Sequence, residues 1–290
     1  MTAVLFGLLG ASFIGVSDCV ARVTTQRVSM SVLFAAVMGL SAAVLTAWML
    51  ISADWPAWDL YGWLVSAVSG VLSLFALAFL YHALARGPVT VASPAASSFS
   101  VLLVVMNALT GAPFAWHQAV AILLVFLGVL MLSRKGRTDV TYETRHLQIT
   151  AALGMAAAVA ISVRMFLAQE AGDVLGAIPA LYLNRIFAIA GVLGLFVFEN
   201  VSGRSRNWPD GSVVWLVVIQ AILETCALAS FLIGSQDGGR IGASIGFASF
   251  AAVTAVTAWI WLGENIGWRR GFWMSVVAAG IVLAVAGQPS

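Results

Sequence analysis

Long apolar runs, separated by short polar interruptions, occupy almost the whole chain. Clustered charges, prolines and glycines mark the interruptions, and each run approaches the roughly 20 residues that a helix needs to cross a bilayer. The runs show little of the alternation with a period of two that membrane-barrel strands require. The pattern therefore predicts ten membrane-spanning helices near residues 3–21, 29–52, 60–83, 88–109, 117–133, 148–169, 176–198, 212–234, 239–262 and 267–287.

The second half of the chain repeats the first at a shift of 152 residues over the last three spans of each half. The matched pairs include Trp63 with Trp215, Gly87 with Gly239, and Trp116 with Trp268. Each half holds five predicted spans, so the two copies must enter the membrane in opposite senses, as in many secondary transporters. We predict an all-α integral membrane fold of two inverted five-helix repeats, residues 1–137 and 148–290, joined by a polar loop at 138–147.

Composition agrees with a membrane location, because 61% of the residues are hydrophobic and only 9% are charged. Soluble domains carry about 25% charged residues. We therefore expect the protein to be embedded in a lipid bilayer. The near balance of 14 Lys and Arg against 12 Asp and Glu does not suggest a nucleic-acid partner. The pattern is compatible with a monomer or a homodimer.

Basic residues are distributed unequally between the two sets of loops. The loops after the odd-numbered spans hold Arg22, Arg27, Arg86, Arg134, Lys135, Arg137, Arg145, Arg204, Arg206, Arg269 and Arg270. The loops after the even-numbered spans hold only Arg240. Because Lys and Arg favour the cytoplasmic side, we expect a bacterial inner-membrane protein with both termini outside the cytoplasm.

Two charged residues fall in the middle of predicted spans, Arg185 in the seventh and Glu224 in the eighth. A charge at that depth costs about 2.5–3.5 kcal/mol on insertion scales, so it requires a partner, a cavity or a function. Gln220 lies one turn before Glu224 on the same face, and Asn184 precedes Arg185. Either Arg185 and Glu224 pair to hold the bundle together, or Glu224 faces a substrate cavity; all four are candidate substrate-binding residues.

Further candidates lie nearer the ends of spans. Asp18 near the end of the first span and Arg164 near the end of the sixth either bind substrate close to opposite mouths or extend their charges to the interface. Tyr81, beside His82 at the end of the third span, has an interface position, and we keep it as a substrate-binding candidate. Ser97 offers a hydroxyl to the cavity or to its own backbone.

The fourth and ninth spans are the expected moving parts. Pro94 interrupts the hydrogen-bond ladder of the fourth span and favours a bend. Gly242 and Gly246 form a GxxxG pattern in the ninth span, which lets helix backbones approach closely. We assign gating to these three residues; tight packing alone is the alternative.

Several short motifs resemble those of the drug/metabolite transporter superfamily, EamA-like branch. They are the segment Phe79–Pro88, the ending Trp261–Asn265 of the ninth span, and the closing run Gly280–Leu283. The resemblance implies a small-molecule carrier with a central cavity lined mainly by spans 1, 3, 4, 6, 8 and 9. The sequence departs from the pattern at Gly111-Ala112, which lacks the acid of the equivalent Gly263-Glu264.

These observations favour a secondary transporter that moves a small polar, amino-acid-like metabolite by alternating access, with export the direction that the resemblance favours. The alternatives are an intramembrane enzyme and a non-transporting membrane subunit. The sequence has no His-Glu-x-x-His metal helix and no Gly-x-Ser-x-Gly elbow, so we expect no enzyme activity, metal or cofactor. Proton coupling requires Glu224 to stand apart from Arg185, whereas pairing favours facilitated or exchange transport.

Overall fold

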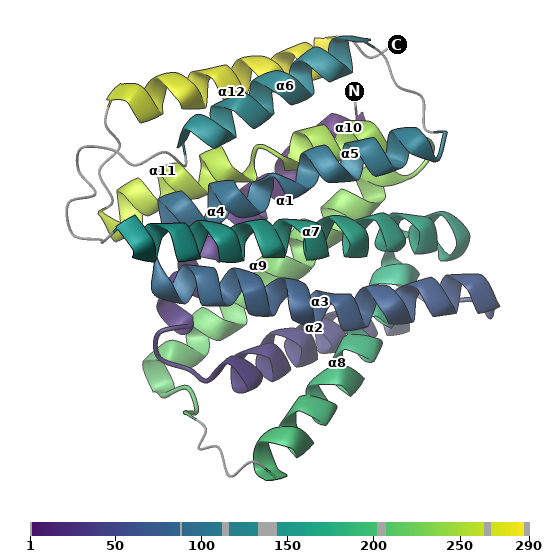
Figure 1. Cartoon of the computed structure of the whole chain (residues 1–290). Helices are drawn as coiled ribbons and strands as arrows, with labels where there is room; N and C mark the ends of the chain where they lie inside the picture. Colours follow the sequence, from purple (N-terminus) through teal and green to yellow (C-terminus); the bar gives the residue numbers. More distant parts are fainter. Residues whose placement is uncertain are drawn as a thin grey trace.

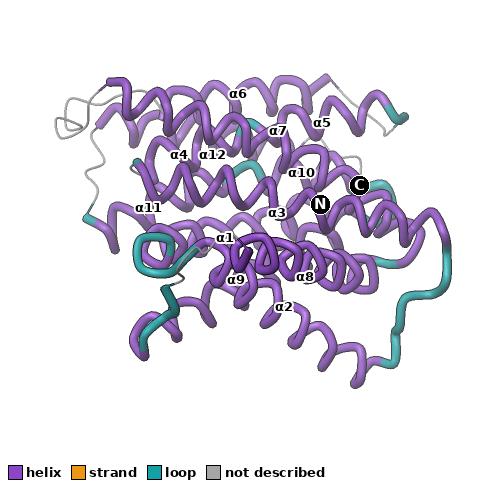
Figure 2. The backbone as a smooth tube through the Cα atoms, turned by 60° about the horizontal axis from the view of Figure 1, so that its bottom comes forward, coloured by secondary structure: helices purple, strands orange, loops and turns teal. Residues whose placement is uncertain are grey.

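The computed structural model describes residues 2–87, 89–111, 116–132, 144–201, 207–263 and 268–286, and these form twelve α-helices without a strand (Figure 1). The first half contains α1 (Thr2–Thr24), α2 (Met30–Ser52), α3 (Leu60–Arg86), α4 (Val89–Ser97), α5 (Phe99–Leu109) and α6 (Trp116–Leu132). The second half contains α7 (Thr144–Leu175), α8 (Ala177–Val201), α9 (Gly211–Ser235), α10 (Arg240–Phe247), α11 (Phe250–Leu262) and α12 (Trp268–Ala286). Short loops connect most of these helices (Figure 2).

Within the described residues, seven helical segments are long and apolar enough to cross a membrane. They are α1, α2, α3, α7, α8, α9 and the combined segment Arg240–Trp261. The predicted helical membrane fold is therefore confirmed, and the chain is a multi-pass membrane protein. Ten crossings remain a prediction.

Two predicted spans are each divided into two helices. The span predicted at 88–109 consists of α4 and α5, which are separated at Ser98, and the span predicted at 239–262 consists of α10 and α11. The Ser98 hydroxyl donates to the carbonyl of Ala95 at 2.8 Å, and the Ser249 hydroxyl donates to the carbonyl of Gly246 at 2.8 Å. A serine that bonds a nearby carbonyl competes with the helical ladder, and such a bond accompanies both interruptions.

The other boundaries follow the sequence pattern to within about four residues, except that α7 continues to Leu175, beyond the predicted end at 169. Asp59 and Asp210 start α3 and α9 by accepting bonds from the amides of Gly62 and Val213, at 2.7 and 3.3 Å, as N-cap carboxylates do. The helix α7 already begins at Thr144, so the last residues of the expected polar loop at 138–147 are helical. Residues 138–143 lie outside the described residues.

The packing of the helices is preserved when the two halves are exchanged. Helix α3 packs against α7 as α9 packs against α1, and α4 contacts α7 as α10 contacts α1. The half-helices follow the same rule, since α4 contacts α11 and α10 contacts α5. Helices α6 and α12 pack mainly on each other and form the layer at the top of Figure 1.

Glycines bring α10 directly against α1. A Cβ added to Gly7 would lie 2.3 Å from the carbonyl oxygen of Ala243, and one added to Gly246 would lie 2.4 Å from that of Val4. Both distances are far below van der Waals contact, so only glycine permits this backbone approach. The short helix α10 is therefore fixed to α1 along one face.

Candidate functional site

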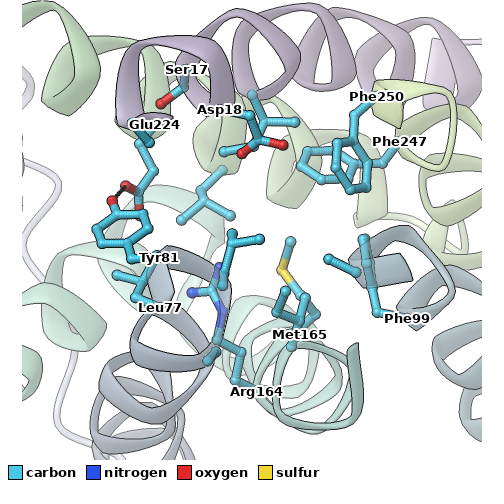
Figure 3. Close-up of a pocket in the computed structure, with 17 residues that line it drawn as sticks. Ser17, Asp18, Leu77, Tyr81, Phe99, Arg164, Met165, Glu224, Phe247 and Phe250 are labelled. Atoms are coloured by element: carbon cyan, nitrogen blue, oxygen red, sulfur yellow. Dashed lines mark hydrogen bonds between the residues drawn. The ribbon is translucent and has the colours of Figure 1, made fainter. Parts of the chain in front are cut away.

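A small cavity of about 40 Å³ lies between the two halves of the chain. Its lining side chains come from α1, α3, α4, α5, α7, α9, α10 and α11, which belong to predicted spans 1, 3, 4, 6, 8 and 9. These are the six spans that the family resemblance implied. Figure 3 shows the cavity with charged side chains on opposite sides and phenylalanines at one end.

One side of the cavity is acidic. Asp18 of α1 and Glu224 of α9 both line it, and each residue is only 3% exposed. The Asp18 carboxylate accepts a hydrogen bond from the hydroxyl of Thr254 on α11 at 3.4 Å. Two carboxylates thus face the same enclosed space from different helices.

Tyr81 of α3 connects this acidic side to a chain of hydrogen bonds. Its hydroxyl donates to Glu224 Oε2 at 3.4 Å and accepts from Gln220 Nε2 at 2.6 Å. Gln220 Oε1 in turn accepts from the Thr24 hydroxyl of α1 at 2.8 Å. The chain holds the Glu224 carboxylate between α1, α3 and α9.

Arg185 lies behind Glu224 and does not line the cavity. It is fully buried on α8, and its Nη2 donates to Glu224 Oε1 at 3.4 Å. Its Nη1 lies 3.0 Å from the sulfur of Met38 on α2. Glu224 therefore both lines the cavity and is ion-paired with Arg185.

Arg164 of α7 supplies the positive charge on the opposite side, where Figure 3 shows its guanidinium turned toward the cavity. Its Nη1 donates to the Ser73 hydroxyl at 3.0 Å. Its backbone carbonyl accepts from Ser69 at 2.9 Å, and Ser69 accepts from Asn184 Nδ2 at 2.8 Å. Among the described residues, Arg164 Nε has no hydrogen-bond partner, so the guanidinium retains donor capacity.

The remaining wall is aromatic. Phe99 begins α5, and its ring centroid lies 6.0 Å from that of Phe247 at the end of α10 and 5.9 Å from that of Phe250 at the start of α11. All three side chains line the cavity. Both broken spans thus present their breaks to the cavity, where a small change in helix direction alters its shape.

The structure brings most of the sequence candidates together. Asp18, Tyr81, Arg164 and Glu224 line the cavity, whereas Arg185, Gln220 and Asn184 contact lining residues or their supports. Arg164 lies 11 residues before the end of α7 at Leu175 rather than close to a mouth. Gly242 and Gly246 are buried in α10. The side chains of Ser97 and Pro94 lie outside the described part of the structure.

Sequence reasoning missed several supporting hydroxyls, among them Ser69 and Ser73. These two serines lie four residues apart, so they share one face of an otherwise apolar span, and that spacing could have identified them. The three cavity phenylalanines had no such signal, because an apolar side chain in an apolar helix looks the same toward lipid and toward a cavity.

A multi-pass helical membrane protein with charged residues gathered around an internal cavity has the architecture of a membrane transporter for small solutes. Residues 1–134 match the family model of the EamA-like transporter family, which confirms the resemblance over the first half of the chain. No curated protein matches the chain. A solved structure titled "Crystal structure of protein" is similar with a TM-score of 0.73 and 18% identity, over 98% of this chain and 96% of the other. That likeness shows a shared fold.

Proposed function

We propose that the protein is a secondary transporter for a small zwitterionic, amino-acid-like solute, which moves by alternating access between two inverted five-helix repeats. The observation that carries the proposal is the position of Asp18 and Glu224 opposite Arg164 in one cavity between the halves. A carboxylate pole suits an ammonium group and a guanidinium suits a carboxylate. Family resemblance favours export as the direction.

The charge balance of the site supports a solute without net charge. The cavity and its immediate surroundings contain two acids, Asp18 and Glu224, and two bases, Arg164 and Arg185. A net anion or cation would add an uncompensated charge in a region of low dielectric, where unpaired charges are costly. A zwitterion adds none, and the phenylalanine wall accommodates an apolar remainder.

The size of the cavity supports a mechanism with moving walls. About 40 Å³ accommodates roughly three water molecules, so an amino acid fits only when the helices separate. The breaks at Ser98 and Ser249 lie beside the cavity and supply local points of bending. Broken helices at the midplane are typical of carriers with inverted repeats.

The exchange of packing partners between the halves supports the inverted repeat. A pseudo-twofold axis between the halves accounts for these matched contacts: the contact of α3 with α7 corresponds to that of α9 with α1, and the contact of α4 with α11 corresponds to that of α10 with α5. With five spans per half, one copy then runs opposite to the other. The pairing of Arg185 with Glu224 at 3.4 Å favours facilitated or exchange transport over proton carriage by Glu224.

Counterflow in proteoliposomes tests the proposal. Vesicles are loaded with each proteinogenic amino acid in turn, and uptake of the same radiolabelled amino acid from outside is measured. For at least one amino acid, this uptake should be saturable. Arg164→Gln should lower the rate at least tenfold, because a hydrogen bond to a charged group contributes about 1.5–3 kcal/mol. Arg164→Lys should retain part of the activity.

Arg269→Gln is the matched control, since Arg269 is exposed at the start of α12, and it should transport at the wild-type rate. If none of the amino acids gives saturable counterflow, the proposed amino-acid-like substrate class is contradicted. Wild-type counterflow by Arg164→Gln would contradict the assigned role of the guanidinium.

A further inference from the structure

We propose that a second polar cluster closes one end of the transport pathway, an inference that rests on the proposed carrier function. We call this cluster the Arg240 gate; its outer layer is Arg240, Glu170, Asp173 and Tyr61. Arg240 Nη1 and Nη2 form ion pairs with Glu170 and Asp173, and its Nε donates to Asp173 at 3.0 Å. The Tyr61 hydroxyl donates to Glu170 at 3.1 Å. This layer joins α3, α7 and α10.

The inner layer of the Arg240 gate consists of uncharged polar residues that are fully buried. Asn107 Nδ2 donates to Gln169 Oε1 at 2.8 Å, and Gln169 Nε2 donates to the Ser235 hydroxyl at 2.9 Å. All three residues have 0% exposure. The inner layer joins α5 of the first half to α7 and α9 of the second.

The order of residues along α7 places both layers between the cavity and the end of the bundle. Arg164 lines the cavity, Gln169 follows in the inner layer, and Asp173 follows in the outer layer. With a rise of about 1.5 Å per residue, Gln169 lies about 7.5 Å and Asp173 about 13 Å beyond Arg164 along the helix axis. A solute that leaves the cavity in this direction must separate both layers.

The two layers have complementary physical properties. The outer ion pairs are partly exposed, with side-chain exposures of 14% for Arg240, 22% for Glu170 and 43% for Asp173. Partly solvated ion pairs contribute little net stability, so they can open and reform during a transport cycle. The inner layer excludes water while the outer layer is closed.

Helix α10 connects the gate to the cavity. Its first residue, Arg240, belongs to the outer layer, and its last residue, Phe247, lines the cavity. The helix has 8 residues and is fixed to α1 by the contacts of Gly7 and Gly246. A displacement of Phe247 by a bound solute would therefore move α10 together with α1, and Arg240 at the other end of α10 would move with it.

Thiol labelling tests the gate without any substrate. Ser235→Cys, in a background with Cys19→Ala and Cys226→Ala, places one thiol in the inner layer. In nanodiscs, a charged methanethiosulfonate should label this thiol slowly in the otherwise unchanged protein. Arg240→Gln, and separately Glu170→Gln with Asp173→Asn, should each accelerate labelling about two- to fivefold, the change expected from losing partly solvated ion pairs, whereas Arg269→Gln should leave the rate unchanged.

A folding control uses native Cys19, which is fully buried. For this control, the gate variants carry Cys226→Ala but keep Ser235 and Cys19, so Cys19 is the only thiol. The reactivity of Cys19 in these variants should equal its reactivity in the protein with Cys226→Ala alone. Acceleration at both thiols signifies general loosening and overturns the proposal, as does an unchanged rate at Ser235→Cys in either gate variant. Amino-acid counterflow with unchanged labelling would contradict the gate alone, whereas accelerated labelling without any counterflow would contradict the carrier function.

Discussion

Arg185 is fully buried although it carries a charge, and Glu224 is its ion-pair partner. The network around them ties the cavity carboxylate to α2, α3, α8 and α9 through Met38, Tyr81 and Gln220. Arg164 is supported in a similar way by Ser69 and Ser73. Each of these cavity charges therefore has a fixed position in the structure, and in the proposed carrier this would lower the cost of binding a solute.

The Arg185–Glu224 pair should show strong energetic coupling. Arg185→Met alone leaves a buried carboxylate without its counter-charge and should lower the free energy of unfolding by about 3–5 kcal/mol. Arg185→Met combined with Glu224→Met removes both charges and should cost much less than the sum of the single changes. Unfolding by SDS titration measures all three variants, and additive costs would show that the pair does not interact.

At the level of elements, serines accompany the interruptions of two spans, and glycines allow close contact between helices. Ser98 and Ser249 each bond a carbonyl three residues earlier, at the junctions α4–α5 and α10–α11. Gly7 and Gly246 then let α10 lie on the backbone of α1. The result is a short half-helix with one firmly packed face and an end at the cavity.

Gly246→Ala tests this packing. The added methyl group would meet the carbonyl oxygen of Val4 at 2.4 Å, so we expect a loss of about 1–3 kcal/mol in the free energy of unfolding from overpacking. Gly194→Ala in α8 is the matched control, because an added Cβ there has no described atom within 4 Å. The control should be neutral or slightly stabilising. Equal effects of the two substitutions in an SDS titration would contradict the close contact of α1 and α10.

At the scale of the whole molecule, the loop charges predict the orientation in the membrane. Arg22, Arg27 and Arg86 lie at the end opposite to Arg240, and basic loops favour the cytoplasmic side. The Arg240 gate would then close the non-cytoplasmic end of the pathway. For an exporter, this gate is the one through which the solute leaves.

Fusions after Ser290 test the orientation directly. We expect alkaline phosphatase at this position to be active and green fluorescent protein to be dark, because both termini are predicted outside the cytoplasm. A fluorescent fusion with inactive phosphatase would reverse the assignment. A second pair of fusions in the loop between α8 and α9 should give the opposite result and serves as the internal control.

Much of this architecture follows from the sequence alone. Apolar run length predicted the helix boundaries to within about four residues, because a bilayer requires both a minimum length and internal satisfaction of the backbone; the exception is α7, which extends to Leu175 instead of the predicted 169. Intramembrane charge identified Asp18, Arg164, Arg185 and Glu224 as candidates, because charge at that depth requires compensation. The matched Trp and Gly positions predicted the inverted repeat of the two halves.

Only the tertiary structure decided which of these residues face the cavity. Helical periodicity does not distinguish a face toward lipid from a face toward an apolar wall, so Phe99, Phe247 and Phe250 carried no signal. Pairing of Arg185 with Glu224, and of Arg240 with Glu170, depends on contacts between residues 39 and 70 positions apart. Such contacts are set by how helices pack on one another, and the hydrophobic pattern of a single helix does not encode its partner.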